Sequence, residues 1–592
     1  MKTLVLFKKK LYLYINQKIK AQGMAKLTLK EYNQHEQWMF PPSIDSFVPQ
    51  NSPARLVNEI VDKLDITGIL ATYKGGGTSA YHPRMMLKVI FFAYMNNTYS
   101  CRKIAAQLEQ NVLYMWLSGN QRPDFRTINN FRSLHLKDTI NDLFVRVVKM
   151  LCEMGYLSLR ELYVDGTKIE SRANKYTFVW KKTVEKNKAR LEAKIRAILS
   201  QIDEGIAQDN QPDDDVAPAI DKAELRARID QINKETLPQE QQKALKTVVD
   251  KMLPKLDEYD EKLAILSQRN SYAKTDPDAT FMHMKEDAMN NGQTKPGYNL
   301  QIGTSQQFIT SFALFPNPTD TLTLIPFLSQ FQSDYDDVLR EVTADSGYGS
   351  EENYMFLEKN GIIPYVKYNY FHKEQQRSYK DNPFLISNLY YNSAEDYFVC
   401  PMGQHMTHVE QRESVTEAGF VTLIDIYEAN NCAGCPLRGQ CHSAKGNRRI
   451  SVNHNLNRLR DRAREHLTSS EGLKHQARRC IEPEAVFGQI KADKQYRRFR
   501  HVGKELVNMD FGIFAIAFNI GKLHKKCGGL PKEACAMGLR VPIGAELTSL
   551  EAFDSSVRQE YGCVRAKKGL VSRRYCVRVS QTPNASEFRA AA

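Results

Sequence analysis

Apolar residues recur at helical spacing through the first quarter of the chain. A Ser-Pro pair at Ser52 favours the start of a helix, and the apolar residues that follow, Leu56, Ile60 and Leu64, fall on one face. Three further helix starts are predicted at Pro83, after Ser100 and after Asp124. The pattern therefore predicts a helical domain over residues 46–150, preceded by a leader and N-terminal arm over residues 1–45.

The helix that follows Asp124 has Ile128 and Phe131 on its apolar side. Its polar residues are predicted to be exposed and available to DNA: Arg126, Asn129, Asn130 and Arg132. A short helix, a turn and a polar-faced helix fit a helix-turn-helix, whose second helix reads the major groove. An ordinary small helical bundle fits the same spacing, so both interpretations stay open.

From Glu161 the apolar pattern changes from helical spacing to alternation, with Leu162 and Val164 on either side of Tyr163. This alternation predicts a strand that ends at Asp165. The segment KPGYNLQIGTSQQFITSFALFPN predicts a hairpin, and two later strands are predicted at residues 338–344, ending at Asp345, and 362–366. Helices separate these later strands. The order predicts an α/β fold with a mixed sheet flanked by helices, in a core formed by residues 158–180 and 271–370.

Two segments are predicted as inserts. Residues 181–270 are rich in Lys, Glu, Asp and Leu at helical spacing, which predicts a helical hairpin or short antiparallel coiled coil with a solvated charged face. Residues 371–470 form an insert that contains cysteines. Residues 471–527 are predicted to supply a Glu-bearing helix and C-terminal core helices, and residues 528–592 a basic tail without periodicity.

Composition narrows the class of partner. The 592 residues contain 82 Lys and Arg against 68 Asp and Glu, and the net charge of +14 favours a polyanionic partner. The most apolar stretch, residues 511–520, is too short for a bilayer, so we expect no contact with a membrane. Eleven cysteines without a secretory signal favour a reducing cytoplasm.

Three carboxylates from distant segments suggest a metal site. Asp165 and Asp345 each follow a strand pattern, and the stretch IEPEAVFGQIK places glutamate at the start of an amphipathic helix. A lone Asp in such a position is more often a turn or capping residue. Together, however, three carboxylates suit hard divalent cations, which promote phosphodiester transfer by positioning and neutralising charge.

These motifs resemble the DDE transposases of bacterial insertion sequences, which have an RNase H-like catalytic core. YVDGTKIES, KPGYN with the later NPTD, TADSGYGS and EAVFGQIK are similar to that family's successive core segments, and the resemblance covers about residues 40–525. It implies that Asp165, Asp345 and Glu484 are catalytic and bind two Mg²⁺ ions, for which Mn²⁺ can substitute. The helical N-terminal region resembles the family's DNA-binding domain.

Two residues are candidates for the catalytic glutamate, Glu484 and Glu482. Related transposases carry Tyr-x2-Arg-x3-Glu-x6-Lys, and Glu484 has Lys491 seven residues later, on nearly the same helix face. The register of Glu482 instead recovers Arg478 but loses the lysine. Phe487-Gly488 and Lys491 favour Glu484.

The resemblance implies a transposase that binds the terminal inverted repeats of its element as a homodimer. It would cleave double-stranded DNA and transfer the freed end to target DNA, in the bacterial cytoplasm and associated with the nucleoid. One alternative is a transposase-derived endonuclease that performs no strand transfer. The other is a catalytically silent, sequence-specific DNA-binding repressor that acts through residues 50–135.

Basic residues cluster after the glutamate helix and suit phosphate binding: Lys491, Lys494, Arg497, Arg498 and Arg500. Tyr496 and Phe499 lie between them. They are available either to stack on bases or to pack in the core.

The cysteine insert predicts a second kind of metal site. Cys432, Cys435 and Cys441, with Cys400 upstream, match the ligands of a tetrahedral structural zinc ion. Reduced core thiols and an iron–sulfur cluster are the alternatives.

Overall fold

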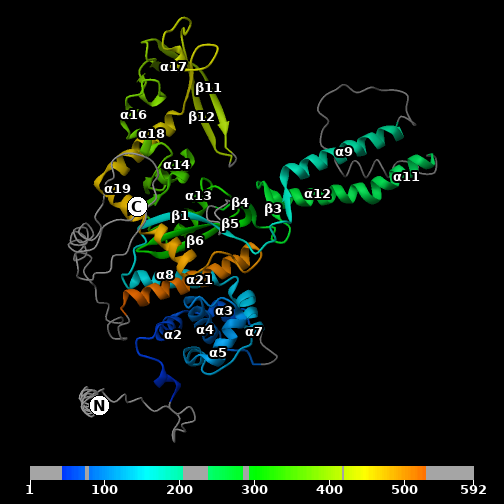
Figure 1. The fold of residues 1–592 in the computed structure, drawn as a ribbon, viewed down its shortest axis with the longest axis vertical. Helices are drawn as coiled ribbons and strands as arrows, with labels where there is room; N and C mark the ends of the chain where they lie inside the picture. Colours follow the sequence, from blue (N-terminus) through cyan, green and yellow to red (C-terminus); the bar gives the residue numbers. More distant parts are fainter. Residues whose placement is uncertain (1–42, 74–78, 204–237, 285–292, 417–418, 529–592) are drawn as a thin grey trace, which may run out of the picture.

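The computed structural model describes residues 43–73, 79–203, 238–284, 293–416 and 419–528. Nearly all of the predicted leader and of the basic tail lies outside these residues, as does part of the helical insert. Figure 1 shows an elongated molecule with the helical domain at one end, the main sheet in the middle and a second, smaller sheet at the other end.

The N-terminal region is helical, as predicted. After a short 3₁₀ helix at Ile44–Phe47, its helices are α2 (Pro53–Lys63), α3 (Thr67–Ala71), α4 (Pro83–Met95), α5 (Cys101–Gln110), α6 (Val112–Leu117), α7 (Phe125–Asn130), a π-helix (Phe131–Leu136) and α8 (Ile140–Glu153). All four predicted helix starts are confirmed. The Ser52 side chain accepts a hydrogen bond from the Ala54 N–H at 3.3 Å, and Asp124 accepts one from the Thr127 N–H at 2.7 Å.

The central sheet is mixed and flanked by helices, which confirms the predicted fold class. Its strands are β1 (Glu161–Glu170), β4 (Thr280–His283), β5 (Thr294–Ser305), β6 (Phe308–Phe315), β7 (Glu341–Ala344) and β8 (Ile363–Val366). The order is β4-β5-β1-β7-β8, with β6 also paired to β5. Strand β1 runs antiparallel to β5 but parallel to β7, and β7 is parallel to β8, an arrangement consistent with an RNase H-like core.

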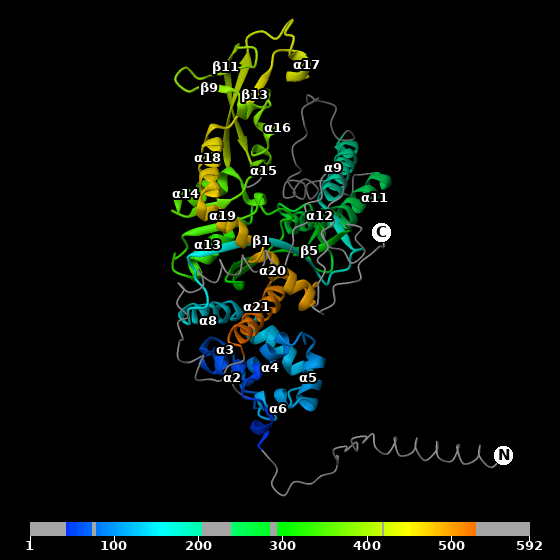
Figure 2. The same cartoon turned by 60° about the vertical axis from the view of Figure 1, so that its left-hand side comes forward.

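Helices cover this sheet and connect it to the N-terminal domain. Helices α13 (Leu324–Asp334) and α14 (Glu351–Lys359) link the later strands. Helix α21 (Lys504–Lys526) packs on β6 as well as on α4 and α8, and Figure 2 shows it between the sheet and the helical domain. It is long and apolar enough to cross a membrane, yet 78% of its most apolar window is buried inside the protein, as in a core helix.

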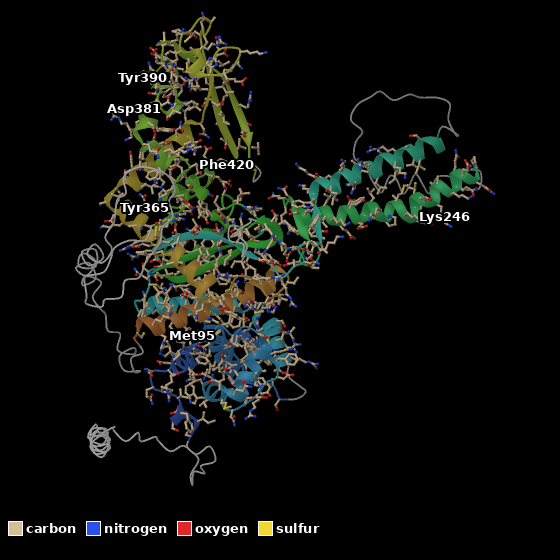
Figure 3. The ribbon with its side chains drawn as sticks, viewed as in Figure 1. Met95, Lys246, Tyr365, Asp381, Tyr390 and Phe420 are labelled. Carbon is tan, nitrogen blue, oxygen red and sulfur yellow. The ribbon has the colours of Figure 1, made fainter. Side chains whose placement is uncertain are left out.

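A helical arm projects from the side of the sheet. It consists of α9 (Lys181–Asp203), α11 (Gln239–Thr247), a π-helix (Val248–Met252) and α12 (Leu253–Leu266), and its base is a small sheet of β2 (Phe178–Trp180) and β3 (Ser271–Ala273). Helices α9 and α12 pack together, and a small apolar cluster includes Ile195, Leu199 and Leu245. Lys246 lies near the far end of the arm in Figure 3.

The outer end of the molecule is a five-stranded antiparallel sheet, here called the tip sheet. Its strands are β9 (Tyr390–Asn392), β10 (Tyr397–Val399), β11 (His405–Val415), β12 (Val421–Ala429) and β13 (Arg449–Val452). The short helices α15 (Phe371–Glu374), α16 (Arg377–Lys380) and α17 (Arg438–Cys441) lie in the same region. Helices α18 (His454–Thr468), α19 (Ser470–Arg479) and α20 (Pro483–Gly488) then return the chain to the central sheet.

Arg132 was predicted to be exposed and available to DNA. This prediction is wrong, because the side chain is only 2% exposed. It pairs at 2.5 Å with Asp510 of α21, whose side chain is fully buried. Tyr94 and Tyr496 also donate hydrogen bonds to this carboxylate. A buried guanidinium requires such a partner, and the pair joins the helical domain to the core helix.

We expect Asp510→Ala to destabilise the chain by about 3–5 kcal/mol, since it leaves the buried Arg132 guanidinium unpaired. Chemical denaturation of the full chain measures this loss. Lys149→Ala, which removes a more exposed pair with Asp336 (3.6 Å apart), is the control and should change stability little. Equal losses of stability in the two variants would contradict the stabilising role given to the Asp510–Arg132 pair.

Candidate functional site

The pairing of β1 with β7 brings the two predicted aspartates together. The strands run parallel with Tyr163 aligned to Thr343, so Asp165 and Asp345 each lie two residues beyond this aligned pair. Asp345 directly follows β7, as predicted. The prediction that the first strand ends at Asp165 is wrong, because β1 continues to Glu170 along its pairing with β5.

Helices α19 and α20 bring the third carboxylate to the same place. Arg479, the last residue of α19, places Nη2 3.5 Å from Asp165 Oδ2 and 3.4 Å from Asp345 Oδ2. Its Nη1 lies 3.6 Å from Glu484 Oε1, at the start of α20. The structure therefore gathers Asp165, Asp345 and Glu484 around one guanidinium, which the sequence analysis had not singled out.

A fourth carboxylate, Asp320, lies beside them. Asn299 and Gln301 each donate a side-chain N–H to its Oδ1 at 2.8 Å. A Cβ atom on Gly166 would come within 2.7 Å of the same oxygen, so glycine is needed next to Asp165. Asp320 belongs to the NPTD motif, which follows the predicted hairpin, but its spacing in the sequence did not predict that it would lie beside Asp165.

The pKa values of the aspartates at this site depend on burial and on the neighbouring charged side chains. Burial raises the pKa of Asp165 to about 6; Arg479 opposes the shift, while Asp345 and Asp320 add to it. Burial would also raise the pKa of Asp345, but Arg479, the Ser346 N–H and Lys367 together hold it below its usual value. Four carboxylates thus face two nearby cationic side chains, an excess of negative charge that suits a divalent cation.

Glu482 occupies a different environment from Glu484. Its residue is 6% exposed, and its Oε2 accepts a hydrogen bond of 2.7 Å from the Gln307 N–H in the turn between β5 and β6. Burial raises its pKa, and burial also lowers the pKa of nearby Lys522 to about 8. The structure therefore separates the two glutamates: one faces the aspartates and the other fastens a hairpin turn.

The basic run after α20 is only partly exposed. Arg497 and Arg498 are exposed, whereas Lys491, Lys494 and Arg500 are half-buried. Lys494 donates to the Met95 carbonyl at 2.7 Å, and the Arg500 guanidinium lies 4.2 Å from the centre of the Tyr99 ring. Residues 489–493 form a π-helix, so the α-helical face expected to join Glu484 to Lys491 is interrupted.

The two aromatic side chains within this run are buried, Tyr496 at 0% and Phe499 at 1% exposure. They pack in the core, so the packing alternative is correct for them and the stacking alternative is wrong. In the N-terminal domain, Arg126, Asn129 and Asn130 are exposed on α7 as predicted.

A second group of potential metal ligands lies at the start of the same two strands. The ligand atoms of Glu161, Glu341 and His475 all lie within 4.8 Å of one another. Both ring nitrogens of His475 already face protein groups, the Tyr163 hydroxyl at 2.9 Å and Glu341 at 3.2 Å. Arg478 lies 3.6 Å from Glu161. These contacts hold α19 against the sheet and so help to position Arg479.

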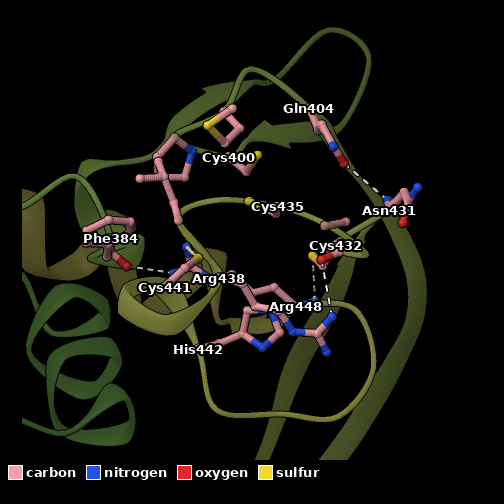
Figure 4. Close-up of a pocket in the computed structure, with 14 residues that line it drawn as sticks. Phe384, Cys400, Gln404, Asn431, Cys432, Cys435, Arg438, Cys441, His442 and Arg448 are labelled. Carbon is pink, nitrogen blue, oxygen red and sulfur yellow. Dashed lines mark hydrogen bonds between the residues drawn. The ribbon is translucent and has the colours of Figure 1, made fainter.

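The four cysteines predicted as zinc ligands line a common pocket in the tip sheet region: Cys400, Cys432, Cys435 and Cys441 (Figure 4). They are remote from the carboxylates, so the chain has two chemically distinct candidate sites.

Comparison with protein families gives two matches. Residues 399–524, from the tip sheet through α21, match the model of a transposase DDE domain. Residues 42–134, which include α2 to α7, match the model of a transposase domain, DUF772. The first match includes Arg479 and Glu484, whereas Asp165 and Asp345 lie outside both. A comparison with curated proteins gave no match.

The different environments of the two glutamates predict different effects on folding. Glu482→Ala should lower stability by about 1–3 kcal/mol, because the Gln307 N–H loses its buried acceptor. Glu484→Ala should leave stability nearly unchanged, since this side chain is 49% exposed. Thermal denaturation of both variants measures the difference, and a larger loss for Glu484→Ala would contradict it.

Removal of the central guanidinium should make stability depend on divalent cations. Like charges about 4 Å apart repel by roughly 1–4 kcal/mol, depending on solvent exposure, and the gathered carboxylates, of which no three lie within 4.8 Å of one another among the described residues, repel more weakly. We therefore expect Arg479→Gln to be destabilised without metal and to regain stability when Mg²⁺ is added. Melting temperatures with and without Mg²⁺ test this.

Arg478→Gln is the matched control, because Arg478 contacts Glu161 instead of the gathered carboxylates. Its melting temperature should respond to Mg²⁺ as that of the wild type does. The same response in Arg479→Gln as in this control would rule out the role given to Arg479.

Proposed function

The chain carries the paired domains of an insertion-sequence transposase, and on that premise we propose that it cleaves DNA at the ends of its element and transfers them to target DNA. Asp165, Asp345 and Glu484 are the proposed catalytic, metal-binding residues. The observation that carries the proposal is their convergence, from three distant segments, on the single guanidinium of Arg479.

The donor set fits Mg²⁺, with Mn²⁺ as a substitute. All the donors are carboxylate oxygens, the ligands that hard divalent cations prefer, and the position among them already accommodates the positive charge of Arg479. Two bound ions would activate the attacking oxygen and stabilise the leaving one. Asp320 lies close enough to Asp165 to raise the pKa of that carboxyl, so it would be an additional ligand.

Side chains of the protein itself hold the proposed metal-binding carboxylates in position. Gln301 donates a hydrogen bond to Asp320 at 2.8 Å and accepts one from the Tyr348 hydroxyl, so this buried network fixes the carboxylate beside Asp165. Bound cations would neutralise the carboxylates in place of Arg479. The planar N–H groups of Arg479 would then be available to a phosphate of the DNA, for which guanidinium has the matching geometry.

The exposed basic and amide side chains define the proposed path of double-stranded DNA. Arg126, Asn129 and Asn130 on α7 are suited to the terminal inverted repeats, and Arg497 and Arg498 lie on the chain just after the glutamate helix. Lys491, Lys494 and Arg500 are half-buried and would support the DNA path from behind. Because an element has two ends, a homodimer that holds one end on each copy is the proposed working form.

The decisive test is metal-dependent cleavage of the DNA that flanks the gene. We expect the purified chain with Mg²⁺ to cut at inverted repeats in this DNA and to join the freed ends to a target plasmid. Asp165→Asn, Asp345→Asn and Glu484→Gln should each reduce both products to background, because each removes a charged ligand from the site. Gel analysis of labelled DNA measures cutting and joining separately.

Glu482→Gln is the matched control, since it retains an acceptor for the Gln307 N–H and should keep cutting activity. Cutting without joining would replace the transposase proposal by the endonuclease alternative. DNA binding without cutting in the wild type would instead support the repressor. Undiminished cutting by all three variants would disprove the assigned residues.

A further inference from the structure

We propose that the tip sheet region binds one structural Zn²⁺ ion through the thiolates of Cys400, Cys432, Cys435 and Cys441. All four cysteines are free of disulfides, and they come from two segments of the chain, one with Cys400 and the other at residues 432–441. The structure brings all four to the lining of one pocket. Figure 4 shows the four side chains and His442 around the same space.

Two tight turns present the thiols. Cys400 accepts a backbone hydrogen bond from the Gly403 N–H at 2.8 Å and donates one to the Gln404 carbonyl at 2.9 Å. Cys432 and Cys435 flank Gly434, which has a φ of +71°, and Gly403 has a φ of +79°. These left-handed positions favour glycine, and they fold each loop back so that its cysteines face inward.

The groups around the sulfurs suit thiolates. The Arg448 N–H donates to the Cys432 sulfur at 3.3 Å, and the Arg448 guanidinium donates to the Cys441 sulfur at 3.1 Å. Arg448 is only 6% exposed. A zinc ion with four thiolates carries two net negative charges, which a buried arginine and N–H donors to sulfur would offset.

His442 adds an independent observation. Both of its ring nitrogens are buried and have no hydrogen-bond partner, although the ring borders the cysteine pocket. Buried polar atoms in this state are costly, so a hydrogen-bond partner that forms only when the pocket is occupied is expected nearby. A thiolate made negative by zinc coordination would accept the N–H of this ring.

Metal binding requires small side-chain movements. Zinc–sulfur bonds of about 2.3 Å place tetrahedral sulfurs about 3.8 Å apart. Among the described residues, no three of these sulfurs lie within 4.8 Å of one another. The proposal therefore requires the cysteine side chains to rotate toward the pocket that they already line.

The hydrophobic core of the tip sheet region is small, so a bound ion would add to the stability of the region. Its cluster of buried apolar side chains has seven members: Leu389, Phe398, Met406, Tyr427, Ala429, Ile450 and Val452. So few residues supply little hydrophobic stabilisation, and small units of this kind are commonly stabilised by a metal ion. Cys400 and Cys432 pack against this cluster, so the ion would fasten the pocket loops to the sheet.

Metal analysis of the full chain tests the proposal. Protein purified without chelator from zinc-supplemented cells should contain about one zinc per chain by mass spectrometry. The double variant Cys432→Ser/Cys435→Ser should lose nearly all of it, while Cys152→Ser, a free cysteine of α8 far from the pocket, should retain it. A metal-free wild type, or zinc that survives in the double variant, would overturn the proposal.

Two further measurements keep the result independent of misfolding and of catalysis. Co²⁺ substituted into the wild type should give the intense visible bands of tetrahedral thiolate coordination, and a brown iron–sulfur chromophore in their place would refute the zinc assignment. A zinc-selective chelator should make residues 399–452 sensitive to protease. Neither readout depends on DNA cleavage, so failure of the proposed function would leave this test intact.

Discussion

Repulsion among carboxylates is the constraint around which this molecule is built. Asp165, Asp345 and Glu484 can share one space only if positive charge lies between them, and Arg479 supplies it at 3.4–3.6 Å from each. The sheet fixes the first two through parallel pairing, and α19 with α20 brings both the third and the guanidinium. This arrangement needs positive charge for its stability, independently of any chemistry, and Arg479 supplies that charge from within the chain.

The rest of the fold keeps these elements in register. Helix α21 is shared by the sheet and the helical domain, and the buried pair of Asp510 with Arg132 joins the two units at its centre. The helical arm and the tip sheet enter between core elements without interrupting the strand order. The proposed DNA-binding surfaces on α7 and after α20 thereby belong to the units that α21 joins to the central sheet.

Much of this was predictable from the sequence, and the failures have physical causes. Caps at Ser52 and Asp124 and the two-residue period around Val164 act locally, so they predicted the type and the start of their elements correctly. The end of the strand was predicted wrongly, because its length depends on pairing with the distant β5. Arg132 was misplaced because its partner, Asp510, is far away in the chain, and helical spacing cannot report a distant counter-charge. Arg479 escaped notice for the same reason: its role exists only after three segments meet.

The two candidate metal sites also explain how one chain would sort its ions. The central site offers carboxylate oxygens, which suit Mg²⁺, whereas the pocket in the tip offers thiols, which suit Zn²⁺. Both arginines are largely buried, Arg479 at 12% and Arg448 at 6% exposure. Two carboxylate partners of Arg479, Asp345 and Glu484, are each 49% exposed, so the proposed Mg²⁺ would reach them from solvent. Arg448 donates to a cysteine sulfur, so it would stay beside the proposed Zn²⁺ and offset the charge of the thiolates.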